Sequence, residues 1–296
     1  MATSQQRPTN ASPMTPEARG QEAVDATHRR RPPTIEEPLS EALNAKRATR
    51  GHCLVVVPTY NEAQNIQRLV IEILGQGPQF DVLVVDDGSP DGTGDLVTAM
   101  AALTPRVQII RRPGKLGLGT AYVAGFGAGL RQGYRYLCEM DADFSHQPRY
   151  LPVLLAVAER AADVALGSRN VPGGRVENWS WARRLISRGG SLYTRTILGM
   201  PVRDCTGGFK CFRAEVLQQI DLDSIGSNGY AFQVEMNYRC HQAGFRLHEI
   251  PIVFPDRVAG QSKMSQQIVW EAAALVLKMR LSPNPYKDLS LARTWD

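Results

Sequence analysis

The chain alternates short, strongly apolar segments with longer segments whose apolar residues recur at helical spacing, and this pattern begins near residue 53. The run Cys53-Leu-Val-Val-Val-Pro58 is rich in β-branched residues, as expected for a strand buried on both faces of a parallel sheet. Residues 62–74 follow with apolar side chains spaced three or four residues apart, which predicts a helix. The alternation continues and predicts further strands at 82–85, 107–110, 136–140 and 164–166. This order of elements predicts an α/β fold with a mainly parallel sheet.

The composition divides the chain into three parts. Residues 1–49 are rich in Pro, Ser, Thr and charged residues and contain few large apolar ones, so we expect a disordered tail. Residues 50–263 carry the α/β pattern, with a less regular second half that predicts helices at 181–198 and 232–242. Residues 264–296 predict an amphipathic C-terminal helix followed by a short tail.

Charge and cysteine content narrow the partners and the compartment. The net charge of +5 fits an anionic partner such as a nucleotide or a phospholipid head group. The five cysteines are odd in number and contain no C-x-x-C pair, so neither a zinc site nor a disulfide framework is expected, and a reducing cytosol fits. No segment reaches the ~18 uninterrupted apolar residues of a membrane span, and no signal-peptide core is evident.

Acidic residues follow three of the predicted strands at the point where each strand ends. The segments are Pro58-Thr-Tyr-Asn-Glu62, Asp86-Asp-Gly-Ser-Pro-Asp-Gly92 and Asp141-Ala-Asp143. Ligands of open α/β sheets bind at the carboxyl ends of the strands, where these loops would meet. So many carboxylates would repel a bare anion. We therefore expect a divalent cation among them, together with a nucleotide whose hydroxyl groups bond to the remaining residues.

The Asp141-Ala-Asp143 segment is the most specific of the three loops. Alternate residues at a strand end point the same way, so both carboxylates can face one ligand. Mg²⁺ and Mn²⁺ prefer oxygen ligands and commonly bind one or two carboxylates together with substrate phosphates. A lone D-x-D pattern also occurs by chance as a solvated turn. Because this one follows a buried strand, the metal interpretation is favoured.

The other acidic loops allow a structural explanation beside the functional one. Asp and Gly form turns and helix caps, and Asp91 is the predicted cap of the next helix. We expect Asp86 and Asp87 to contact the base or ribose, because adjacent acids at a strand end are costly without a ligand. Tyr60 and Glu62 are assigned to the same ligand, with packing and helix capping as the alternative.

The glycine-rich segment 115–122 reads Lys-Leu-Gly-Leu-Gly-Thr-Ala-Tyr. It is not a P-loop, because Lys-Ser/Thr does not follow its glycines, and position 122 rules out the G-x-G-x-x-G pattern. The segment allows two interpretations equally well. Its glycines could let a helix start face a phosphate, or they could only let the first turn of a helix pack closely against its neighbours.

In their order and composition these segments resemble glycosyltransferase family 2, and more narrowly the dolichol- or polyprenol-phosphate mannose synthases. The likeness runs from about residue 53 to about 265. It rests on Val-Val-Pro-Thr-Tyr-Asn-Glu, Val-Val-Asp-Asp-Gly-Ser-Pro-Asp-Gly-Thr, Leu-Gly-Leu-Gly-Thr-Ala-Tyr, Met-Asp-Ala-Asp and Asp256-Arg-Val-Ala-Gly-Gln-Ser-Lys263. The resemblance implies a Rossmann-like GT-A catalytic domain over residues 50–263, GDP-mannose as donor and Mg²⁺ or Mn²⁺ as cofactor. It also implies a polyprenyl phosphate acceptor, whose mannosylated product serves as a membrane mannosyl donor.

The resemblance also implies roles for single residues. The nucleotide contacts fall to Pro58, Tyr60, Glu62, Val85 and Asp87. Asp141, Ala142 and Asp143 would bind ribose, metal and diphosphate, with Asp143 the principal metal ligand and Ser145 a weaker one. Neutralisation of the diphosphate and the incoming phosphate falls to Arg169, Arg257 and Lys263. The acceptor phosphate would be contacted by Arg183 and Ser187.

Three other functions remain open at this point. A UDP-glucose-dependent lipid-phosphate glucosyltransferase would share nearly every motif. A nucleotidyltransferase would usually have a glycine-rich basic loop after the first strand, where this chain has Pro-Thr-Tyr-Asn-Glu. A non-catalytic binding module would not need the acidic metal cluster. No nucleic-acid partner is expected.

The predicted C-terminal helix bears on how the chain meets a lipid. Residues 264–281 leave a broad apolar surface, which would pack on the protein's own core or lie against a membrane. We expect a cytoplasmic protein bound peripherally to the cytoplasmic face of the membrane. The sequence leaves open whether a separate integral membrane protein brings it there.

Overall fold

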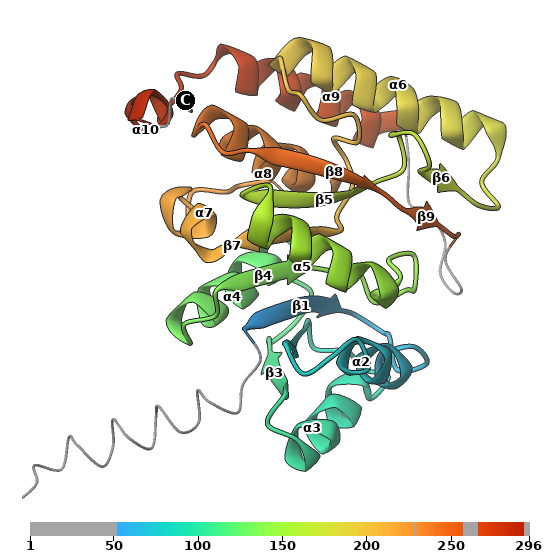
Figure 1. Cartoon of the computed structure of the whole chain (residues 1–296). Coiled ribbons are helices and arrows are strands. Elements are labelled where there is room, and N and C mark those ends of the chain that lie inside the picture. Colours follow the sequence, from blue (N-terminus) through green and yellow to red (C-terminus); the bar gives the residue numbers. More distant parts are fainter. Residues whose placement is uncertain (1–51, 228, 257–265, 293–296) are drawn as a thin grey trace, which may run out of the picture. The chain divides into compact units, whose positions relative to one another are not determined.

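The computed structural model describes residues 52–227, 229–256 and 266–292, and a seven-stranded sheet forms its centre (Figure 1). The strands lie in the order β3-β2-β1-β4-β7-β5-β8. The first four along the chain are β1 (Cys53–Thr59), β2 (Phe80–Asp86), β3 (Val107–Arg111) and β4 (Tyr136–Glu139). The others are β5 (Val164–Ser168), β7 (Lys210–Arg213) and β8 (Leu247–Pro251). A separate parallel pair consists of β6 (Arg175–Val176) and β9 (Val253–Phe254).

The sheet is parallel except at β7, which pairs antiparallel with both β4 and β5. The predicted α/β class with a mainly parallel sheet is therefore confirmed. Since β7 runs against its neighbours, the turn that leads into it lies at the edge where the parallel strands end. Residues 204–209 thus join the loops that follow β1, β2, β4 and β5.

Helices connect the strands, and the helix predicted at 181–198 has those bounds in the structure, whereas α7 and α10 below were not predicted. In the first half they are α2 (Ile66–Leu74), α3 (Thr93–Leu103), α4 (Leu118–Arg131) and α5 (Leu151–Arg160), the last after a 3-10 turn at Pro148–Tyr150. In the second half they are α6 (Trp181–Leu198), α7 (Ala214–Gln219), α8 (Tyr230–Gln242), α9 (Gln266–Leu281) and α10 (Lys287–Ala292). The helix predicted from residue 62 begins at Ile66, after a turn in which the amides of Asn65 and Ile66 donate to the Glu62 carbonyl.

Alternate residues of each strand face opposite sides of the sheet, and both sides are covered. Leu54 and Val56 of β1 pack in one core with α4 and α8, while Val55 and Val57 pack in a second core with α2 and α5. Helix α4 lies close to the sheet because it carries glycines there. A Cβ at Gly125 would come within 2.3 Å of a Val56 methyl group.

The predicted tail, and the basic residues Arg257 and Lys263, fall outside the described part of the chain. Residues 1–51 and 257–265 are not described, so the disorder expected for 1–49 and the boundaries at 50 and 263 stay predictions. Among the helices of the described ranges, none combines the length and apolar character that a membrane crossing requires.

Candidate active site

The carboxyl ends of β1 and β2 are tied together by Asp86. Its Oδ1 accepts a hydrogen bond from the Thr59 hydroxyl at 2.9 Å and its Oδ2 accepts one from the Ser89 amide at 3.0 Å. The side chain is 3% exposed. Asp86 therefore shapes the loop after β2, and the nucleotide contact predicted for it stays a prediction.

Asp87 joins the same loop to the glycine-rich segment. Its carboxylate forms an ion pair with Arg112 and accepts hydrogen bonds from the amides of Leu116 and Gly117 at 3.1 and 3.3 Å. A Cβ at Gly119 would lie 2.6 Å from the Ser227 carbonyl oxygen. Of the two interpretations of residues 115–122, the geometry favours a close-packed helix entry.

Tyr60 and Glu62 lie in the loop after β1, at the same edge. The Tyr60 ring is 38% exposed, and the Lys115 ammonium lies 4.4 Å from its centroid. Glu62 accepts a hydrogen bond from the Asn65 side-chain amide at 2.9 Å. The half-buried Pro58 ends the apolar part of β1, whereas the Val85 side chain is fully buried and could offer a nucleotide only its backbone.

The D-x-D segment follows β4 and forms a tight loop. Asp143 Oδ1 accepts hydrogen bonds from the Ser145 amide at 3.0 Å and from the Ser145 hydroxyl at 2.5 Å. Asp141 Oδ1 accepts one from the Tyr122 hydroxyl at 3.1 Å, and Ala142 between them is buried. Phe144 has a φ of 62°, a left-handed conformation that is costly for a bulky residue and clusters at functional sites.

This loop has the donor chemistry that a Mg²⁺ or Mn²⁺ ion requires. Asp141 and Asp143 supply carboxylate oxygens two residues apart, and Ser145 holds one oxygen of Asp143 in place. The Asp141 side chain is 29% exposed, so its carboxylate is accessible from solvent. Hard divalent cations prefer such all-oxygen sets. The residues present therefore fit the expected ion.

His146 packs against the D-x-D loop and holds it in place. Its Nδ1 accepts a hydrogen bond from the Asp141 amide at 3.0 Å, and its ring stacks on Phe209 at 4.9 Å. Burial lowers the pKa of His146. A neutral imidazole fits this geometry, because Nδ1 must be unprotonated to accept. We assign it a loop-structuring role.

Arg169 lies where β5 ends and is held by an acid that the sequence motifs did not identify. Its Nε and Nη2 donate to the two carboxylate oxygens of Asp204 at 2.7 and 2.6 Å, and Nη2 also reaches the Thr206 hydroxyl at 3.0 Å. Arg169 is 7% exposed and Asp204 1%. Asp204 stands in the turn before β7, whose antiparallel direction brings it to this edge.

A cavity of about 310 Å³ opens beside these residues, between α6, α8 and α9. Its walls are largely apolar and include Ile186, Tyr193, Val234, Leu275 and Val276. Arg169 and Arg183 also line it. Their guanidinium carbons lie 5.6 and 3.8 Å from the centroid of the same Trp179 ring, so both cations gather at one end of the cavity.

The residues carried over for the acceptor meet at this cavity as far as the structure describes them. Arg183 donates to Asp256 at 2.9 Å, and Ser187, one helical turn later, lines the cavity. Arg257 and Lys263 lie outside the described residues. The structure thus brings Arg169 to the same cavity as Arg183 and Ser187, although Arg169 was assigned from a different motif.

A buried polar network connects the D-x-D loop with the cavity wall. Lys210 on β7 bonds to Gln233 on α8 and lies 3.5 Å from Glu139 on β4, and all three are at most 3% exposed. Burial raises the pKa of Glu139 to about 6 even though the nearby Lys210 ammonium lowers it. Glu139 stands two residues before Asp141, and Gln233 is a neighbour of the cavity-lining Val234.

Comparison with known proteins gives matches over most of the chain. The family model for glycosyl transferase family 2 matches residues 54–221. An undecaprenyl-phosphate mannosyltransferase from Micrococcus luteus is 49% identical over 229 residues, which cover 77% of this chain and 94% of that protein. A polyprenol monophosphomannose synthase from Mycolicibacterium smegmatis is 48% identical over 220 residues, which cover 74% and 83%.

Solved structures extend the comparison to the fold. Glucosyl-3-phosphoglycerate synthase from Mycobacterium tuberculosis, solved with Mn²⁺, UDP-glucose and phosphoglyceric acid, matches 87% of each chain with a TM-score of 0.58 and 19% identity. At this identity the likeness concerns the arrangement of sheet and helices.

Proposed function

The chain belongs to glycosyltransferase family 2, and we propose that it transfers mannose from GDP-mannose to the phosphate group of a polyprenyl phosphate. The expected GT-A fold is confirmed by the family match and the structural neighbours. The observation that carries the proposal is the cavity, which has apolar walls and two arginines at one end. A phosphate head group suits the arginines, and an isoprenoid chain suits the walls.

The donor is proposed to bind along the edge formed by the loops after β1, β2 and β4. Tyr60 and Glu62 would contact the nucleotide, and its diphosphate would lie toward Asp141 and Asp143. These two aspartates, with Ser145 beside them, would hold a Mg²⁺ or Mn²⁺ ion, which neutralises charge on a departing diphosphate when bound. Arg257 and Lys263, outside the described residues, are proposed to assist at the phosphates.

The proposed reaction inverts the sugar centre. A phosphate oxygen of the acceptor forms a bond to the anomeric carbon while the bond from that carbon to the diphosphate breaks. A phosphate monoester has a second pKa near ~6 and is anionic at neutral pH, so it needs orientation more than a strong general base. Arg169 is fixed by Asp204, and Arg183 by Trp179 and Asp256, so both can orient that phosphate.

The same arrangement supports peripheral membrane association, and we propose that it occurs at the cytoplasmic face. Helices α6 and α9 lie side by side (Figure 1), joined by the Tyr193 hydroxyl, which donates to the Ala273 carbonyl at 3.2 Å. Both helices expose apolar side chains, namely Trp181, Leu185, Ile186, Leu192, Leu277 and Leu281. Exposed basic residues stand among them, namely Arg184, Arg188, Lys278 and Arg280. We propose that this surface, termed the α6–α9 surface, contacts the membrane.

The described part of the helix predicted at 264–281, residues 266–281, packs on the core and also exposes apolar side chains, and this exposure supports the proposed membrane contact. Val276 is buried in the core with α8, while Leu277 is 47% exposed. Sequence periodicity could not separate these roles, because it does not show which neighbour covers each residue.

One reaction tests the proposed function. Purified protein is incubated with Mg²⁺, a polyprenyl phosphate and either GDP-mannose or UDP-glucose, and the lipid product is identified by mass. We expect a polyprenyl-phosphate hexose with GDP-mannose alone. If product formed only from UDP-glucose, the donor would be UDP-glucose and not GDP-mannose. Absence of any lipid product would disprove the proposed function.

A further inference from the structure

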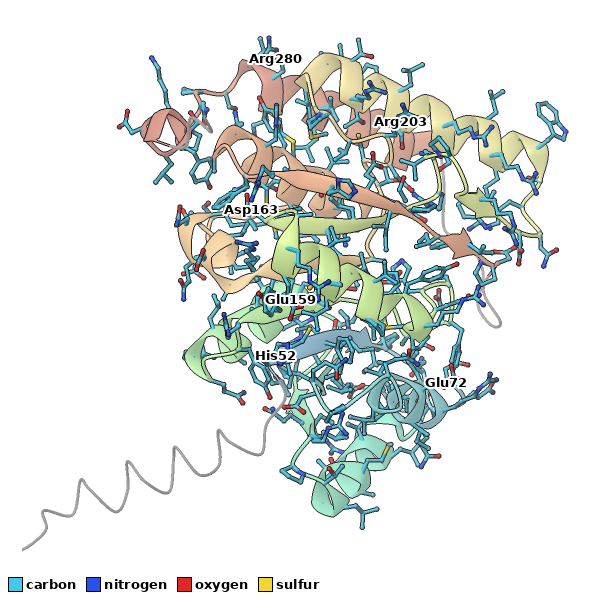
Figure 2. The ribbon with its side chains drawn as sticks, viewed as in Figure 1. His52, Glu72, Glu159, Asp163, Arg203 and Arg280 are labelled. Carbon is cyan, nitrogen blue, oxygen red and sulfur yellow. The ribbon has the colours of Figure 1, made fainter. Side chains whose placement is uncertain are left out.

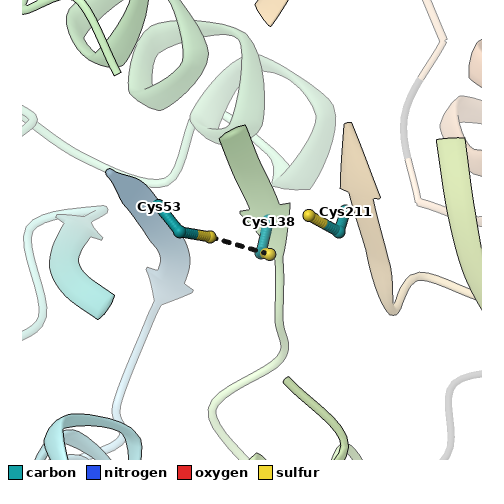
Figure 3. A group of neighbouring side chains, drawn as sticks. All are labelled: Cys53, Cys138 and Cys211. Carbon is teal, nitrogen blue, oxygen red and sulfur yellow. Dashed lines mark hydrogen bonds between the residues drawn. The ribbon is translucent and has the colours of Figure 1, made fainter. Parts of the chain in front are cut away.

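Three cysteines from the strands β1, β4 and β7 form a cluster in the core (Figure 3). Cys53 begins β1, Cys138 lies on β4 and Cys211 lies on β7. Their Sγ atoms all lie within 4.8 Å of one another, and those of Cys53 and Cys138 are 3.5 Å apart. Cys138 and Cys211 are direct partners across the antiparallel pair. The strand order thus brings together thiols from three distant parts of the sequence.

The spacing of these sulfur atoms suits one soft metal ion. Bonds from a metal to thiolate sulfur are about 2.3 Å long, so three sulfurs around one ion in a plane lie ~4 Å apart. The separation of 3.5 Å between Cys53 and Cys138, and the upper limit of 4.8 Å for all three pairs, lie close to that value. Small rotations of the side chains would therefore be enough to place an ion among them.

The number and kind of ligands narrow the choice of ion. Structural zinc is almost always bound by four ligands, whereas this group in the described residues contains three cysteines and no fourth His, Asp or Glu. All three side chains are 0% exposed, so the group lies in a dry part of the core. Soft sulfur ligands favour Cu⁺.

We propose that Cys53, Cys138 and Cys211 bind a single Cu⁺-class ion, which links β1, β4 and β7 inside the core. No electron is transferred, because the ion binds in its reduced form, and the thiols that bind it release their protons to solvent. The exposed His52 directly precedes Cys53, pairs with Glu159 at 3.2 Å (Figure 2), and packs edge-on against Tyr136.

The test is competition for Cu⁺ between the reduced, full-length protein and a colorimetric Cu⁺ chelator under anaerobic conditions. We expect the wild type to retain one Cu⁺ per chain and to melt at a higher temperature when loaded. Changing outer-shell partners of a metal site costs 10- to 100-fold in affinity, so Cys138→Ala should weaken binding by at least about 100-fold. X-ray absorption of the loaded protein should show coordination by sulfur.

The chain supplies a matched control. Cys205 and Cys240 are also buried and free but lie outside the cluster, so the variant Cys205→Ala/Cys240→Ala should bind like the wild type. Cys138→Ser, which keeps the volume of the side chain, replaces Cys138→Ala if the latter fails to fold. Loss of all copper from native wild type to the chelator would overturn the proposal. Retention unchanged by both Cys138 substitutions, or binding only after unfolding in urea, would overturn it too.

Discussion

The two sides of the candidate site are built in opposite ways. On the donor side, carboxylates bond within their own loops or to the strand beside them in the sheet. Asp143 bonds to Ser145 in its own loop, and Asp86 bonds to Thr59 on the neighbouring β1. On the acceptor side, apolar side chains from three helices enclose a cavity, and its two arginines pair with acids that lie 35 and 73 residues away along the chain.

The difference matches what each side must do. Charge that develops on a diphosphate is stabilised best by groups that are already fixed in place, and the donor loops are fixed by hydrogen bonds within and between them. A flexible isoprenoid chain offers few hydrogen bonds, so apolar walls with one charged end are sufficient for it. Damage to the donor side should therefore stop the chemistry, whereas damage to the acceptor side should weaken recognition of one substrate.

The largest effect is expected for Asp143→Ala. Loss of the proposed principal metal ligand should lower transfer by at least about 1,000-fold and weaken donor and Mn²⁺ binding. The fold should survive, because the lost bonds to Ser145 lie within one loop. Turnover is measured with a labelled donor, and Mn²⁺ affinity by calorimetry. Asp95→Ala, which removes an exposed carboxylate from α3, is the control and should change neither. Near-normal turnover of Asp143→Ala with a chelator present would disprove the metal assignment.

The same contrast explains how much could be predicted from the sequence. The donor loops are contiguous motifs at strand ends, so the alternation of strands and helices is enough to place Asp86, Asp87, Asp141 and Asp143 at one edge of the sheet. The cavity is assembled from residues between 169 and 276, and no local pattern shows that α6, α8 and α9 meet.

Particular residues show where the prediction failed. Asp204 holds Arg169 because β7 runs antiparallel, and the direction of a four-residue strand cannot be read from its composition. Lys210 within an apolar strand was a usable signal, since a buried lysine requires a partner. Its partners Glu139 and Gln233 come from other elements, so they could not be named from the sequence.

The second prediction concerns the network between the two sides. Lys210→Met removes the cation but keeps most of the volume, and it leaves Glu139 without its buried partner. Removing one member of a buried pair costs about 3–5 kcal/mol, which urea unfolding would measure. The double variant Lys210→Met/Glu139→Gln should recover much of that loss, because no uncompensated charge remains.

This pair of variants also tests whether the network positions the D-x-D loop. If it does, the double variant should regain stability while its Mn²⁺ affinity stays below that of the wild type. Equal recovery of stability and Mn²⁺ affinity would limit the network to a structural role.

The third prediction separates the two substrates. Arg183→Ala should lower kcat/KM for the lipid phosphate by a factor that corresponds to a loss of about 2–4 kcal/mol of transition-state stabilisation. The affinity for GDP-mannose should change little, because the proposed contact is with the acceptor. Arg160→Ala, which removes an exposed arginine at the end of α5, is the control and should keep normal acceptor use. Steady-state kinetics with each substrate varied in turn gives both values. An equal loss of donor affinity in Arg183→Ala would contradict the division between the two sides.

The smallest effect is expected at the α6–α9 surface, where the acceptor side meets the membrane. Trp181, Leu185, Arg188 and Leu192 are spaced four, three and four residues apart, so they form one exposed stripe along α6. Partial insertion of the two leucines is worth about 1.4 kcal/mol, so Leu185→Asp/Leu192→Asp should weaken binding to anionic liposomes roughly tenfold. Liposome flotation measures this, and high salt should weaken wild-type binding as well, because the basic residues attract anionic head groups.

The melting temperature of the double variant should hardly change, since both leucines are 63% exposed. Leu103→Asp places the same charge on α3, where the leucine is 87% exposed, and should bind like the wild type. Undiminished flotation of the double variant would show that the membrane is reached by another surface.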